Sequence, residues 1–147
     1  MKFKMKNYSL WIKIASIFQI ITGLIHGVSL FMHPEPTNDA EHQMIELMET
    51  VKLDLGAGFH KTMMDLFMDL SAHFTLAYLM GGIINWYLLR KKADPSLIAG
   101  VLTVNVIIFG LSFGLTVVHA FLPPIICTGL TFLFLVISRI SVGRATP

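Results

Sequence analysis

Apolar residues gather in four long runs along the chain, which cover about residues 9–33, 62–89, 96–120 and 124–142. A hydrocarbon layer about 30 Å thick requires about 20 helical residues to cross it. Each run has roughly this length, and a backbone surrounded by lipid must satisfy its polar groups within the helix itself. The pattern therefore predicts four transmembrane helices packed as a bundle.

The connection between the first two runs follows a different pattern. Asn38 followed by Glu41 resembles the capping box that begins a helix. Apolar residues then recur at helical spacing, and Gly56 and Gly58 suit a helix stop. We therefore expect an amphipathic helix over about 38–55, lying on the outer surface of the bundle or in the headgroup layer.

Composition supports this fold class. The chain has 147 residues, of which 54% are hydrophobic and 14% are charged, whereas soluble domains carry about 25% charged residues. We expect one all-α integral membrane domain over residues 1–147. The net charge of +2 gives no indication of a nucleic-acid partner, and the single Cys127 excludes an internal disulfide and a multi-cysteine metal cluster.

Basic residues predict the orientation. Nine of the eleven would lie on one side of the membrane: Lys2, Lys4, Lys6, Lys13, Arg90, Lys91, Lys92, Arg139 and Arg144. Because Lys and Arg accumulate in cytoplasmic segments, both termini are expected in the cytoplasm, with the chain in an inner membrane. Trp11, Trp86 and Tyr87 suit an aromatic belt at the same face.

Three of the runs carry polar residues at spacings of four or seven, which keep side chains on one helical face. The stripes are Gln19, His26 and His33; Asp65, Asp69 and His73; and Asn105, Ser112 and His119. Ionisable side chains in lipid are costly and usually face the protein interior. The sequence thus predicts an outward-facing polar pocket built from His26, Asp69, His73, Asn105, Ser112 and His119.

Simpler roles stay open for several of these residues. Asp65 and Asp69 also suit a helix N-terminus, where the helix macrodipole favours anions. Asn105 and Ser112 also suit hydrogen bonds between neighbouring helices.

The first functional hypothesis is a pocket for a lipid-like, sterol-like or quinone-like molecule. Asp69 and His73 lie four residues apart and could form a carboxylate–imidazole pair that moves a proton or holds a polar head. The helix over 38–55 would cover the mouth. Whether the protein is an enzyme stays open, and so does the identity of any cofactor.

Two alternatives remain. A metal ion or haem could bind through His26 and His73. Six methionines crowd the outer side, where soft thioethers would suit Cu(I): Met32, Met44, Met48, Met63, Met64 and Met68. Alternatively, the chain is an accessory or assembly subunit of a membrane complex, in which the pairs Gly23/Gly27 and Gly110/Gly114 allow close helix contact, internally or with a partner.

Three segments carry a family resemblance: "GLIHGVSLFMHPEP", "GFHKTMMDLFMDLSAHF" and "HAFLPPIICTGLTFLFLVIS". The chain resembles small uncharacterised bacterial four-helix membrane proteins, which are DoxX-like in size and topology. This resemblance implies the four-helix fold and no established activity. The architecture is also similar to the sterol-isomerase-like proteins related to the sigma-2 receptor. Those keep acidic residues on their first helices, a role that Asp69 matches in kind, whereas His26 and His33 stand on the first helix here.

Overall fold

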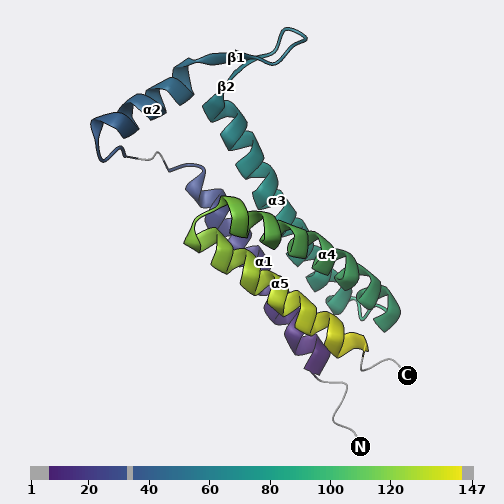
Figure 1. Ribbon diagram of the computed structural model, residues 1–147. Coiled ribbons are helices and arrows are strands. Elements are labelled where there is room, and N and C mark those ends of the chain that lie inside the picture. The colour runs from purple at the N-terminus through teal and green to yellow at the C-terminus, as the bar shows by residue number, and fades with distance from the viewer. Residues whose placement is uncertain (1–6, 33–34, 144–147) are drawn as a thin grey trace, which may run out of the picture. The chain divides into compact units, whose positions relative to one another are not determined.

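In the part of the chain that the structure describes, all regular secondary structure is helical apart from one short hairpin. The computed structural model describes residues 7–32 and 35–143. The elements in chain order are α1 (Asn7–Ser29), α2 (Asp39–Thr50), β1 (Lys52–Asp54), β2 (His60–Thr62), α3 (Met63–Arg90), α4 (Pro95–His119) and α5 (Leu122–Gly143). Figure 1 labels these elements.

Four of the helices, α1, α3, α4 and α5, are long and apolar enough to cross a membrane. They coincide with the four runs predicted from the sequence, which confirms the helical spans. The main difference is at the end of the first span, which was expected to reach residue 33. There α1 ends at Ser29 and the chain continues through turns, with the Met32 N–H donating to the Ser29 carbonyl over 3.1 Å.

Contacts divide the chain into two compact units, where the sequence suggested a single domain. The first, here called the bundle unit, comprises Met1–Thr22 and Tyr78–Pro147. The second, here called the loop unit, comprises Gly23–Ala77. Both α1 and α3 contribute one part to each unit, and the two units are described separately below.

The bundle unit holds α4 and α5 as an antiparallel pair, seen side by side in Figure 1. Its apolar core includes Ile12, Tyr78, Leu102, Phe109 and Leu135. The Tyr78 and Phe109 rings meet edge to face, with centroids 4.9 Å apart. Outside this core, large apolar side chains are exposed, among them Leu111 at 67% and Val118 at 72%. Such an outer surface is suited to lipid, because polar residues normally cover a soluble domain.

Four buried hydroxyl groups in the bundle unit are satisfied within their own helices. Ser16 donates to the Ile12 carbonyl over 2.7 Å, and Thr131 donates to the Cys127 carbonyl over 2.8 Å. Thr128 and Ser138 make the same bond to the residue four positions earlier. These side chains therefore enter the interior without needing a partner on another helix.

Three buried amides form a ladder across α1, α3 and α4. The Asn105 amide donates to the Asn85 carbonyl oxygen, and the Asn85 amide donates to Gln19 Oε1, each over 3.1 Å. Gln19 is fully buried, and its Nε2 has no hydrogen-bond partner among the residues that the structure describes. Asn105 thus links helices, which is the simpler of the two roles that the sequence allowed.

Glycine is required beside this ladder. A Cβ at Gly81 would lie 2.7 Å from Gln19 Nε2 and 3.4 Å from Asn105 Oδ1. Gly110, one of the glycines predicted to allow close contact, would bring a Cβ within 2.9 Å of the Phe132 ring, whereas a Cβ at Gly114 meets nothing within 4 Å. Close approach is thus confirmed at Gly110, and Gly114 faces open space.

Helix boundaries in the bundle unit follow local sequence signals. The Asp94 carboxylate accepts the Ser96 N–H over 2.8 Å and caps α4, with Pro95 at the first helical position. This hydrogen bonding lowers the pKa of the Asp94 carboxyl. Pro123 and Pro124 lie in the first turn of α5, where missing N–H groups cost no helical bond.

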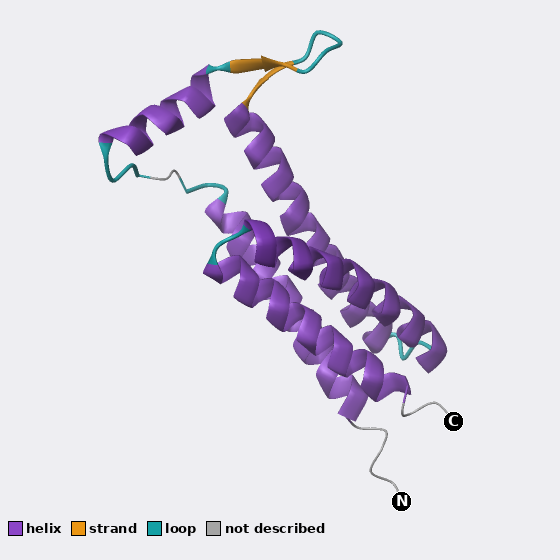
Figure 2. Cartoon of the chain, viewed as in Figure 1, coloured by secondary structure: helices purple, strands orange, loops and turns teal. Residues whose placement is uncertain are grey.

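The loop unit contains α2, which is shorter than the sequence suggested. Its N-cap is Asn38, whose side chain accepts the Glu41 N–H over 2.9 Å, as the capping pattern predicted. The helix ends at Thr50 instead of continuing to 55, because Lys52–Asp54 pairs with His60–Thr62 as an antiparallel hairpin. Figure 2 shows these strands between α2 and α3.

The two glycines expected to stop a helix form the hairpin tip instead. Gly56 and Gly58 have φ values of 79° and 81°, and Ala57 between them has a φ of 51°. The left-handed region is accessible to glycine without steric cost, so the pair allows the chain to reverse here. The helical periodicity of residues 51–55 was overridden by this turn.

We predict that Gly81→Ala lowers the free energy of unfolding by about 1–3 kcal/mol, because the added methyl group overpacks the buried amide ladder. Gly114→Ala is the matched control on a spanning helix. It should be neutral or stabilising by up to about 1 kcal/mol, since alanine is the better helix former. Unfolding of the full chain in detergent micelles measures both, and equal stabilities for the two variants would contradict the prediction.

Candidate functional site

A cavity of about 390 Å³ lies in the loop unit. Its walls come from the end of α1 and the segment after it, from α2, and from the start of α3. The apolar lining residues are Leu30, Met32, Pro36, Met44, Ile45, Met48, Met64, Phe67 and Met68, and the polar ones are His26, Ser29, Glu35, Glu41 and Ser71. We call it the methionine cavity, because five of the fourteen described residues that line it are methionines.

Two helices present a complete helical face to this cavity. On α2 the lining residues are Glu41, Met44, Ile45 and Met48, and on α3 they are Met64, Phe67, Met68 and Ser71. Both sets follow the spacing i, i+3, i+4, i+7 that defines one side of a helix. Helical faces therefore form two of its walls, and the cavity is open, since Met44 and Phe67 remain more than half exposed.

His26 is the imidazole of the methionine cavity. It is half-buried near the end of α1 and interacts with the backbone carbonyl of Ser71. Its ring meets Phe74 edge to face, with centroids 4.8 Å apart. Next to it, a Cβ at Gly27 would lie 3.1 Å from Thr75 Cγ2, so α1 and α3 approach closely here. The close approach and the ring contact fix the position of the imidazole.

The α2 wall is anchored at its first turn. The Glu41 carboxylate accepts hydrogen bonds from both the backbone N–H and the hydroxyl of Thr37, each over 2.7 Å. A capping box would have the Glu41 carboxylate accept the backbone N–H of Asn38. Instead, the carboxylate bonds to Thr37, one residue earlier in the chain. The Thr37 N–H, followed by its hydroxyl, lowers the pKa of the Glu41 carboxyl.

Asp65 has a structural role at the start of α3. Its backbone N–H donates to the Thr62 hydroxyl, and its carboxylate accepts the Thr62 N–H, each over 3.1 Å. This reciprocal pair is a capping box, with aspartate in the place of the usual glutamate. The simpler role considered for Asp65, at a helix N-terminus, is the one that the geometry shows.

Asp69 and His73 lie on the exposed surface of α3, with side chains 67% and 72% exposed. His73 Nδ1 is 2.8 Å from the Asp69 backbone carbonyl oxygen and 3.6 Å from its carboxylate. The carbonyl is thus the nearer partner of the imidazole. Neither residue lines the methionine cavity. The reason is geometric, because residues one position apart on a helix point about 100° apart and the cavity face begins at Met64, not at Asp65.

The other three predicted residues belong to the bundle unit. Asn105 is the end of the amide ladder, Ser112 is half-buried, and His119 is exposed at the last position of α4. Thr116 donates to the Ser112 carbonyl over 2.7 Å. His33, which extended the stripe on the first helix, lies outside the described residues.

Within residues 7–32 and 35–143, no group of three or more His, Cys, Asp or Glu side chains is arranged to hold a metal ion. A haem bound between two imidazoles would need both to face one cavity. Of His26 and His73, only His26 lines the methionine cavity. A soft metal bound by thioethers is considered below.

The methionines of the cavity were predictable from the sequence, whereas Phe67 and Ser71 were missed. Five of the six methionines singled out from the sequence line the cavity, and Met63 does not. The signal for the other two residues was present, because Met64, Phe67, Met68 and Ser71 share one helical face. The neighbouring Asp and His stripe drew attention to the wrong face of α3 for this cavity.

No protein-family model matches the chain, and searches of the curated proteins and of the solved structures found no similar protein. The resemblance to DoxX-like proteins therefore stays a prediction, and the argument for function is carried by the site.

We predict that acidification loosens the first turn of α2. Because the folded pKa of Glu41 lies below its ordinary value of 4.5, its stabilising contribution is complete above pH 4.5 and is lost as the pH falls through the lower folded value. The protection factors of the first-turn amides of α2, which correct for the pH dependence of intrinsic exchange, should fall a few-fold, since this exposed contact is a weak one. Glu41→Gln should abolish the pH dependence, and Glu46→Gln, on the same helix, should retain it.

Proposed function

We propose that this chain is a small inner-membrane protein that binds a lipid-like or quinone-like molecule in the methionine cavity. One observation carries the proposal: complete faces of α2 and α3, together with the end of α1, converge on an apolar cavity that contains one positioned imidazole. Ligand sites commonly combine apolar walls with a few polar groups that fix orientation. The volume of about 390 Å³ falls within the range of such sites, about 300–1,000 Å³.

The chemistry of the walls favours a flexible apolar body. Methionine side chains are unbranched and polarizable, so they adapt to irregular or varied ligands. Phe67 adds an aromatic surface for a flat ring. Among the described residues of the lining, His26 is the one imidazole, and it can donate a hydrogen bond to a carbonyl or accept one from a hydroxyl. A quinone or the polar head of a lipid provides such a group.

The topology proposed with this function places both termini in the cytoplasm. Basic residues support this orientation, because Lys and Arg accumulate on the cytoplasmic side. Those that the structure describes are Lys13, the Arg90–Lys92 turn and Arg139. The others lie outside the described residues: Lys2, Lys4, Lys6 and Arg144. The methionine cavity would then open on the outer side. In this arrangement α2 lies at the outer surface, with Met44 and Leu47 more than half exposed to the headgroup layer.

We expect His26→Phe to weaken binding of a short-chain ubiquinone about five- to tenfold, because a ligand hydrogen bond is worth about 1–1.5 kcal/mol. His42→Phe is the matched control, since His42 lies on α2 and does not line the cavity. Titration of the purified full chain in mild detergent measures the affinities. Equal affinities for the two variants would count against His26 as the ligand contact.

Two additional variants locate the ligand more sharply. Asp69→Ala and His73→Ala alter the exposed face next to the cavity. If they weaken binding more than His26→Phe does, the ligand occupies the pocket predicted from the polar stripes and not the methionine cavity. Mass spectrometry of the purified protein identifies a retained lipid or quinone, and a co-purifying protein in its place would favour the accessory-subunit alternative.

A soft metal ion is the second candidate, because five thioethers and one imidazole line a single cavity. Replacing Met44, Met48 and Met64 together by leucine separates the two candidates. Leucine preserves apolar volume and removes sulfur, so ubiquinone binding should change little whereas Cu(I) binding should be lost. Competition with a Cu(I) chelator measures the metal affinity, and an unchanged value in the triple variant would exclude the thioether site.

A further inference from the structure

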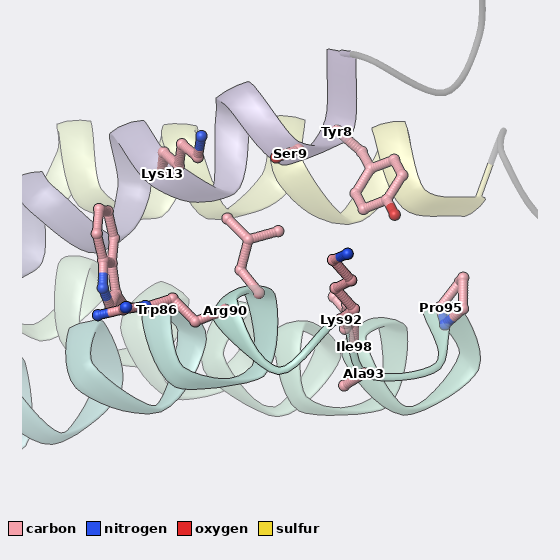
Figure 3. A pocket seen from close by; sticks show the side chains of 10 residues that line it. Tyr8, Ser9, Lys13, Trp86, Arg90, Lys92, Ala93, Pro95 and Ile98 are labelled. Carbon is pink, nitrogen blue, oxygen red and sulfur yellow. The ribbon is translucent and has the colours of Figure 1, made fainter.

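A second cavity, of about 480 Å³, lies in the bundle unit. It is formed by the start of α1, the end of α3, the turn after α3 and the start of α4 (Figure 3). Three cationic side chains line it, namely Lys13, Arg90 and Lys92, together with the polar residues Tyr8 and Ser9 and the indole of Trp86. We call it the basic cavity.

Among the described residues that line it, the basic cavity has no acidic side chain. Asp94 is next to it in sequence, but its carboxylate is engaged by the Ser96 N–H as the cap of α4. Among the residues that the structure describes, none of the three cations takes part in an ion pair. An anion in this cavity would therefore supply a charge partner that the described residues do not.

Lys92 occupies a backbone position that normally favours glycine. The Ala93 N–H donates to the Leu88 carbonyl over 3.0 Å, and the Lys92 N–H donates to the Leu89 carbonyl over 3.2 Å. These two bonds define a Schellman motif, which places Lys92 at the residue after the helix cap. Its φ is 51°, in the left-handed region that disfavours residues with a Cβ.

The Lys92 side chain extends from this turn toward α1, and the Tyr8 hydroxyl points toward the same space (Figure 3). A lysine in a strained position that directs its ammonium group into a cavity suggests a role for the charge. A stabilising glycine would have been the simpler choice for the turn.

We propose that the basic cavity binds a phosphate-bearing anion, with the headgroup of an anionic phospholipid as the form that suits it best. The Lys92 ammonium and the Tyr8 hydroxyl, which point toward one space, provide donors for the oxygens of a phosphodiester, and Lys13 and Arg90 add positive charge to the lining. Helices α1 and α4 begin beside the cavity and α3 ends there. Since these helices are long enough to span a membrane, their ends lie at headgroup level, and basic pockets between helices at this level bind lipid phosphates. Trp86 provides the amphipathic ring common at this interface.

The test compares two neighbouring lysines in the full chain, purified in neutral detergent. Phosphatidylglycerol should raise Tm in the unmodified protein, and phosphatidylcholine should not. Lys92→Gln should weaken the apparent affinity for phosphatidylglycerol about fivefold, the expected effect of one basic residue at a membrane surface. Lys91→Gln is the matched control, because Lys91 lies over the Tyr87 ring, 5.8 Å from its centroid, and does not line the cavity.

The Lys92→Gly variant separates the effect of Lys92 on the stability of the fold from its effect on anion binding. It should raise Tm without lipid, because glycine relieves the left-handed strain, and it should lose most of the shift caused by phosphatidylglycerol. A second arm uses inorganic phosphate, and protection by phosphate without protection by the lipid would support the same chemistry with a soluble source. Equal losses for Lys91→Gln and Lys92→Gln, or no shift with either anion, would overturn the proposal. None of these variants lies in the methionine cavity, so its ubiquinone affinity should not change.

Discussion

Polar groups in this chain must find their partners inside the protein, and the rest of the architecture depends on that requirement. Hydrocarbon offers a carbonyl, hydroxyl or amide no hydrogen bond, so each polar side chain on a spanning helix needs an internal solution. The hydroxyls of Ser16, Thr128 and Thr131 return to their own helices, and the amides of Gln19, Asn85 and Asn105 bond to one another. Because these hydrogen bonds are made inside the protein, the outer surfaces of the helices can be apolar. In contrast to a soluble bundle, polar side chains lie in the interior and large apolar side chains lie on the outer surface.

The methionine cavity depends on a different set of interactions, located outside the spanning segments. Helix α2 is fixed at its start by Asn38 and Glu41, and the chain returns to α3 through a hairpin that ends at the Thr62–Asp65 capping box. These local bonds decide which face of each helix meets the cavity. No residue of α2 is fully buried. The wall that α2 contributes is therefore held by its ends, and its apolar face remains available to a ligand or to lipid.

Much of this arrangement could be predicted from the sequence, and the failures have identifiable causes. Spans were predictable because run length is set by membrane thickness, and the Asn38 cap because its bond is local. The hairpin was missed because a helical period over residues 51–55 competes with turn-forming glycines, and only tertiary pairing decides between them.

The polar stripe on α3 was recognised, but periodicity does not reveal which of two adjacent faces meets a cavity. Met64 and Asp65 are neighbours in sequence, so their side chains point about 100° apart on α3. The face that begins at Met64 lines the cavity, whereas the face that carries Asp69 and His73 does not. The amide ladder could not be predicted from the sequence, because its three residues are far apart in the chain and meet only in the folded bundle.

That ladder has a consequence for how the protein is made. Gln19 is synthesised long before Asn85 and Asn105, so the first helix enters the bilayer with an amide that has none of its eventual partners. Insertion precedes helix association in membrane proteins, and an unmatched amide in the nascent helix would favour retention beside the translocation machinery or water until the later helices arrive. Once they do, both bonds require one register, since sliding a helix by a single residue rotates its amide out of line. The complete ladder can thus form only after α4 has been synthesised, because Asn105 lies on that helix.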